Sequence, residues 1–203
     1  MWQRALDFAL RPRLPKGYRP GETLARLQRD LSGLDYLGEE GGCRRYALPG
    51  SNWSVLVSEV VDSQLLLHTV SCRFSLQLPL AGPVRPCRLA FNHRGSWRRS
   101  GIACRLLRGD AEELAVLRQR LVQDADLHTA LMPLDFKRCE LLGDAAGWRV
   151  EIEPFAASEV VGRFPPFRRY IRLINTQKLA VLAAMAALRR LLLAQDGPPL
   201  TQD

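Results

Sequence analysis

The clearest pattern in the chain is an alternation of apolar and polar residues within 65–78. Apart from one histidine, the residues that share one face are apolar: Leu66, His68, Val70, Cys72, Phe74, Leu76 and Leu78. The residues between them are mostly polar: Thr69, Ser71, Arg73, Ser75 and Gln77. Alternation with period two is typical of an antiparallel sheet with one covered face. We therefore expect a long strand between a packed core and a polar surface.

Six further segments are predicted to be strands, because apolar residues recur between turn-forming residues. They span residues 43–48, 53–61, 87–91, 102–106, 134–142 and 148–155. Short connections favour hairpins, including one whose basic tip spans 93–101.

Helical spacing of leucines predicts helices over 24–34 and after Asp110-x-x-Glu113, the second breaking near 124–126 and stopping at Met132-Pro133. A long helix is expected over 166–195, with proline at its start and Gly197 after its end. The sequence thus predicts an α+β fold: a curved antiparallel sheet of about seven strands, with helices packed mainly on one face and a long C-terminal helix. We expect residues 1–203 to form a single domain, with 1–20 as a basic, proline-containing arm.

The composition is that of an ordinary globular protein, with 47% hydrophobic and 25% charged residues among 203. The net charge of +8 comes from 29 basic residues, all but three of them arginine. Such an excess is compatible with anion binding, because guanidinium groups pair with phosphate and carboxylate, but it equally follows from genome composition.

Five scattered cysteines without a C-x-x-C pair indicate a reducing compartment, and the first ten residues do not resemble a secretory signal. The longest apolar run, 179–188, is shorter than the ~18–20 residues that cross a bilayer. We therefore predict a cytoplasmic protein without a transmembrane segment.

No catalytic constellation is visible. His68 and Cys72 share a strand face, but their Cα atoms should lie about 13 Å apart, so both are interpreted as core residues. Cys87 and Cys104 alternate with apolar residues and are interpreted in the same way.

Two acidic groups could form sites. Asp124, Asp126 and His128 offer metal-ligand atoms, but Asp126 is more simply the N-cap of a short helix, and no metal is predicted. Glu151 and Glu153 could share acid–base work, but a hairpin centred on Ala145 would place Glu153 opposite Lys137 as a structural ion pair. We favour that structural interpretation.

Two basic, aromatic segments could bind an anion. The candidate residues are His93, Arg94, Trp97, Arg98, Arg99, Arg168, Arg169 and Arg172. The alternative is a polar hairpin tip with Trp97 folded back, and a solvent-facing arginine side of the last helix. In that helix Phe167, Tyr170, Ile171 and Ile174 would turn inward.

The second half of the last helix is apolar all round, which indicates burial against the sheet, a subunit interface or a lipid surface. The residues expected at an interface or cavity are Ala180, Ala183, Ala184, Ala187 and Met185.

We expect a non-enzymatic module that binds a small ligand or a protein, with an apolar cavity or interface under the C-terminal helix. The alternatives are an arginine-rich binder of nucleic acid or phosphate, and a small enzyme whose site is not visible in the sequence. No cofactor is predicted. The expected partners are a second copy of the chain or a small apolar ligand, ahead of nucleic acid.

Overall fold

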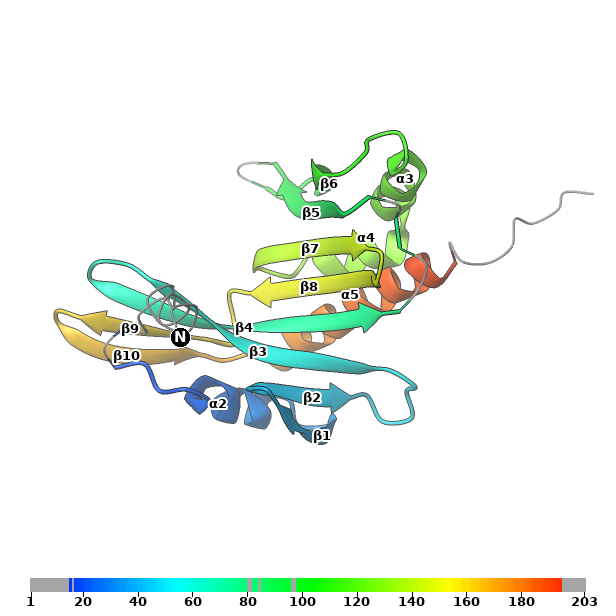
Figure 1. The fold of residues 1–203 in the computed structure, drawn as a ribbon. Helices are drawn as coiled ribbons and strands as arrows, with labels where there is room; N and C mark the ends of the chain where they lie inside the picture. Colours follow the sequence, from blue (N-terminus) through cyan, green and yellow to red (C-terminus); the bar gives the residue numbers. More distant parts are fainter. Residues whose placement is uncertain (1–14, 16, 80–81, 84, 96–97, 195–203) are drawn as a thin grey trace, which may run out of the picture.

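The computed structural model describes residue 15 and residues 17–79, 82–83, 85–95 and 98–194. This part of the chain forms four helices and ten strands (Figure 1). The helices are α2 (Glu22–Asp30), α3 (Ala115–Gln123), α4 (Ala125–Leu131) and α5 (Asn175–Leu193). The strands are β1 (Asp35–Glu40), β2 (Cys43–Ala47), β3 (Ser54–Ser63), β4 (Leu67–Leu78), β5 (Cys87–Arg94), β6 (Gly101–Arg108), β7 (Phe136–Asp144), β8 (Gly147–Pro154), β9 (Ser158–Arg163) and β10 (Pro166–Ile171).

All ten strands belong to one antiparallel sheet, which does not close on itself. Its main order is β1-β2-β3-β4-β8-β7-β5-β6, and β9 and β10 branch from it. Along one edge of β4, residues 67–71 pair with β9 and residues 74–78 pair with β8. Between these two strands Ala157 has a left-handed backbone (φ 55°), and its carbonyl accepts a hydrogen bond from the Cys72 N–H at 3.0 Å. One edge of β4 therefore pairs with two strands in succession, β9 and β8.

Within the described residues, the helices pack on one face of the sheet, and the other face carries no helix layer. A row of buried residues crosses four strands through Val57, Phe74, Ile152 and Cys139. These residues belong to one core cluster with the inner residues of α5, among them Met185. Figure 1 shows α4 and α5 behind β7 and β8. The predicted division of β4 into a core side and a polar side is confirmed, because every second residue from His68 to Leu78 is buried.

The predicted class, α+β with an antiparallel sheet and a long C-terminal helix, is confirmed, but the sheet has ten strands and not about seven. The additional strands are β1, β9 and β10. Strand β1 lies at the sheet edge and is exposed along most of its length. An edge strand buries neither face fully, so no alternation of apolar residues marks it.

The prediction of one helix over 166–195 is wrong at its start. Residues Pro166–Ile171 form β10 opposite β9, and α5 begins only at Asn175. Proline has no N–H to donate, which a first strand position tolerates, and the following residues alternate between the two faces of the sheet. Consequently Phe167 and Ile171, which a helix would have turned inward, are exposed, as is Ile174.

Two carboxylates fix the ends of α2. Glu59 accepts hydrogen bonds from the Tyr18 hydroxyl (2.7 Å) and from the Gly21 and Leu24 N–H groups at the start of the helix. Asp30, the last residue of α2, is buried and accepts from the Tyr170 hydroxyl (2.9 Å) and from the backbone N–H that precedes α5. Burial and the bond to Asp30 raise the pKa of Tyr170. The helix is thus attached to β3, β10 and the start of α5.

A third carboxylate joins α4 to α5. The N-cap of α4 is Asp124, whose side chain accepts from the Leu127 N–H at 2.8 Å, so the prediction of Asp126 as the cap is wrong. The Arg190 guanidinium of α5 lies 2.7 Å from Asp124 and 3.1 Å from Asp126. Burial opposes ionisation of Asp124, but the Leu127 N–H and Arg190 outweigh it and lower the pKa of its carboxyl.

We expect Asp124→Ala to lower the free energy of unfolding at pH 7 by about 1 kcal/mol, because the cap and the ion pair are both lost. A carboxyl whose pKa is lower in the folded state than in the unfolded chain stabilises the fold at pH values above its unfolded pKa of about 3.9. This stabilisation is lost as the pH falls through the folded pKa. The difference between wild type and Asp124→Ala should therefore shrink below about pH 4.

Urea titrations at several pH values measure this difference. The matched control is Asp126→Ala, which removes a carboxylate that contacts the same arginine but is 80% exposed. An equal loss in both variants, or a difference that does not change with pH, would contradict the role of Asp124.

Candidate functional site

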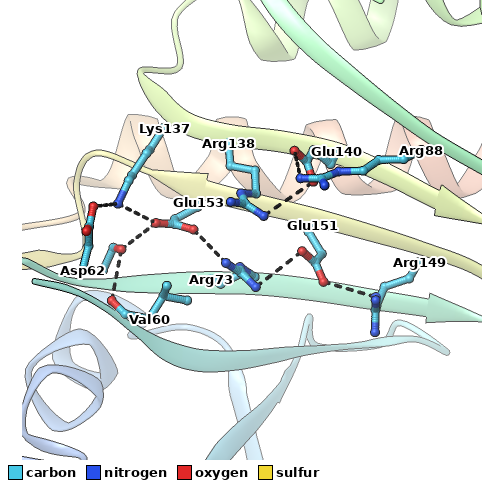
Figure 2. A network of polar contacts seen from close by, with 11 residues as sticks. Val60, Asp62, Arg73, Arg88, Lys137, Arg138, Glu140, Arg149, Glu151 and Glu153 are labelled. Carbon is cyan, nitrogen blue, oxygen red and sulfur yellow. Dashed lines mark hydrogen bonds and ion pairs between the residues drawn. The ribbon is translucent and has the colours of Figure 1, made fainter. Parts of the chain in front are cut away.

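The face of the sheet turned away from α5, here called the open face, carries a charge network (Figure 2). Its centre is Arg73 on β4, which lies 3.6 Å from Glu151 and 3.2 Å from Glu153 on β8. Glu153 is only 1% exposed, and it also accepts a hydrogen bond from the Ser71 hydroxyl at 2.6 Å. Two nearly buried carboxylates therefore share one guanidinium.

The network continues across the neighbouring strands. On β5, Arg88 binds Glu140 of β7 through two nitrogens, at 2.8 and 2.9 Å, and this pairing raises the pKa of Arg88. On the same face Arg149 lies 3.2 Å from Glu151. The bidentate geometry favours a fixed arrangement of both side chains.

The predicted pair of Lys137 and Glu153 forms, at 3.6 Å, and Lys137 also binds Asp62 at 3.0 Å. Their register differs from the prediction, however, because an irregularity at the start of β7 places Arg138 opposite Glu153. The two glutamates thus have the structural partners that favoured an ion-pair interpretation.

Beside this network the open face is hollowed by a groove of about 430 Å³. Its lining comes from five consecutive strands and their connections: Arg45, Ser54, Leu56, Ser75, Gln77, Leu78, Pro79, Leu142, Asp144, Ala146, Gly147, Trp148 and Arg149. We call this hollow the groove. Arg45 on β2 and Arg149 on β8 are both about half exposed, and three strand spacings separate their strands, about 14 Å. Arg149 belongs to both the groove and the charge network.

Two of the candidate residues on the β5–β6 hairpin contact the end of α4 and the α4–β7 connection. His93 lies 2.9 Å from the Leu131 carbonyl, and Arg99 donates to the Met132 carbonyl and pairs with Asp135. Arg94 and Arg98 are exposed, and Trp97 lies outside the described residues. Two of the predicted anion ligands therefore already have protein partners.

The second group lies on β10 and at its end, far along the sheet from the first. Arg168 pairs with Glu22 (2.9 Å) and Glu159 (3.0 Å), and Arg172 pairs with Asp30 at 3.1 Å. Arg169 is exposed on the opposite side of the strand. The structure does not bring the two basic groups together, and anion binding by them stays a prediction.

Four of the five thiols are buried, as a structural role requires. Cys72 is buried with His68, and burial raises its pKa as it does that of Cys139. Burial also raises the pKa of Cys104 to about 11. Neutral thiols are poor nucleophiles.

Within the described part of the chain no group of three His, Cys, Asp or Glu side chains is arranged to hold a metal ion.

The small residues of α5 divide between two environments. Ala180, Ala184, Ala187 and Met185 are buried, whereas Ala183 is exposed. None of the residues that line the groove belongs to α5. None of the helices in the described ranges has the length and apolar character needed to cross a membrane.

Sequence reasoning missed Arg73 and the groove. Arg73 occupies one of the polar positions of β4, but its two glutamates come from a strand about 80 residues later. The only available signal was the period-two pattern, which places Arg73, Ser75 and Gln77 on one face without indicating which strands lie beside them.

We expect Arg73→Met to lower the free energy of unfolding by about 3 kcal/mol, since two buried carboxylates lose a shared cation. The matched control is Arg45→Met, because Arg45 lies 4.0 Å from an exposed glutamate and such pairs contribute little. Adding Glu153→Gln to Arg73→Met should recover part of the loss. Urea unfolding measures these changes in the free energy of unfolding. Similar losses in Arg73→Met and Arg45→Met would contradict the role of the network.

The chain was compared with known proteins. The family described as Protein of unknown function (DUF3156) matches residues 29–192, which include the sheet, the groove, α3, α4 and all but the last residue of α5. Searches of curated proteins and of solved structures found no match. Because the match covers most of the 203 residues, the chain belongs to the DUF3156 family.

Proposed function

We propose that this chain is a non-enzymatic binding protein, and that its ligand is a small molecule with an acidic group and an apolar body. The observation that carries the proposal is the groove on the open face. Its volume of about 430 Å³ falls within the range of ligand pockets. The proposed ligand site is therefore on the side of the sheet away from α5.

The chemistry of the lining supports this class of ligand. Leu56, Pro79 and Leu142 provide an apolar surface, and Ser75 and Gln77 provide neutral hydrogen-bonding groups. Arg45 and Arg149 provide charge. Each guanidinium has five N–H donors, so a pairing with one glutamate leaves donors for a carboxylate or phosphate.

The charge network fixes the position of Arg149, one of the residues that line the groove. Glu151 holds Arg149 at 3.2 Å and is itself held by Arg73. A side chain fixed in this way loses less conformational entropy when it binds a ligand, which favours affinity. The buried carboxylates thus position one of the two charged groups that the ligand would meet.

Native mass spectrometry of the purified protein, followed by calorimetric titration with octanoate and with 1-octanol, tests the proposal. We expect a reproducible small adduct, and binding of octanoate in preference to the uncharged alcohol. The double variant Arg45→Ala/Arg149→Ala should weaken octanoate binding about 10- to 100-fold, the effect of losing hydrogen bonds to a charged group.

A second variant tests the location. Gln77→Trp places a large side chain in the groove and should prevent binding, whereas Asn92→Trp, also exposed on a strand but outside the groove, should not. Equal effects of the two substitutions, or the absence of both an adduct and octanoate binding, would rule the proposal out.

A further inference from the structure

The end of the sheet farthest from the groove exposes large apolar side chains at the tips of two hairpins. Leu65 and Leu66, in the β3–β4 connection, are 86% and 62% exposed, and Phe164, in the β9–β10 connection, is 86% exposed. The two tips are neighbours, because Leu67 of β4 pairs with Gly162 of β9 just before each strand reaches its connection. Figure 1 shows both hairpins projecting at the same end of the molecule.

The side of β10 that faces away from α2 continues this exposed surface. Phe167, Arg169 and Ile171 alternate with residues that contact α2, and they line a hollow of about 460 Å³ together with Val160, Tyr170 and Arg172. The Phe167 ring lies across Gly162, where a Cβ would be only 2.2 Å from it. Apolar side chains and an exposed arginine are therefore combined on one short hairpin.

The exposed charge of this hairpin is positive, because its one acidic residue, Glu159, is buried and paired with Arg26 and Arg168. Between residues 163 and 172 the sequence has four arginines and no acidic residue. On the other tip, Asp62 is paired with Lys137 at 3.0 Å. Arg168 and Arg172 are paired with acids, but Arg169 is exposed beside the apolar side chains. A surface that combines exposed apolar residues with an exposed arginine is complementary to an anionic lipid surface.

We propose that the two tips, Leu65, Leu66 and Phe164, dock this protein on an anionic membrane surface, with Arg169 contacting lipid phosphates. Arg169 lies three strand residues behind the start of β10, about 10 Å along the strand. Side chains that bind at a membrane interface enter it by roughly 5–10 Å, so insertion of the tips brings Arg169 to the level of the headgroups.

The area of the tips favours a lipid surface over a second copy of the chain. Three leucine or phenylalanine side chains expose on the order of 400–500 Å², whereas a stable protein interface buries roughly 800 Å² on each partner. A bilayer needs no complementary protein surface, since its interface accepts any projecting apolar group.

Sedimentation of the full chain with lipid vesicles tests this proposal. We expect binding to vesicles of phosphatidylcholine mixed with phosphatidylglycerol, little binding to phosphatidylcholine alone, and weaker binding as salt is raised. The double variant Leu65→Ser/Phe164→Ser should lower partitioning at least about tenfold, because both apolar side chains are removed from the interface. Arg169→Gln should lower the partitioning to anionic vesicles about fivefold.

The control is Val116→Ser on α3, which removes an apolar side chain of comparable exposure (60%) from another part of the surface. It should leave partitioning unchanged. No binding to either vesicle, equal losses in the control and the tip variant, or a dimer that dissociates on Phe164→Ser would each overturn the proposal. None of these readouts depends on a ligand in the groove.

Discussion

Strand β4 holds the sheet together, because it pairs with β3 along one edge and with both β8 and β9 along the other. Its twelve residues, about 40 Å of extended chain, are the only part of the described sheet that contacts three other strands. The side chains of β4 alternate between the core and the open face. Residues that pair with β4 point to the same face as their partners on it. The groove lies near the last residues of β4, Arg73 near its middle, and the hairpin tips beyond its first residue.

The sequence predicted this division because burial on one side of a strand leaves a local pattern. It predicted seven of the ten strands for the same reason. The pattern fails for β1, an exposed edge, and for β9 and β10, whose inward face carries charged groups. In this hairpin Glu159 and Arg168 are turned toward α2, where Glu22 and Arg26 balance them. Those partners lie more than 130 residues away, which a local pattern cannot reveal.

The candidate site also depends in part on contacts that a local sequence pattern cannot reveal. Glu153 and Lys137 were predicted as a pair because one hairpin brings them together, and the pair forms. The groove, by contrast, depends on β2 lying three strands from β8, which follows from the sheet order and not from any short segment. Arg168 and Arg172 look like free cations in the sequence, but buried acids bind them. Their role in the structure is to attach β10 to α2.

The period of two in β4 also determines where the chain tolerates insertions and deletions. Adding one residue between Ser71 and Arg73 would reverse every later side chain of the strand, turning Phe74 to the open face and Arg73 into the core. Adding two would restore the faces but shift the pairing with β8 by two residues. The fold therefore tolerates changes in length best at connections such as residues 48–53, which lie outside the ladder. Among natural relatives, we expect length variation at such hairpin connections and a constant length from Leu67 to Leu78.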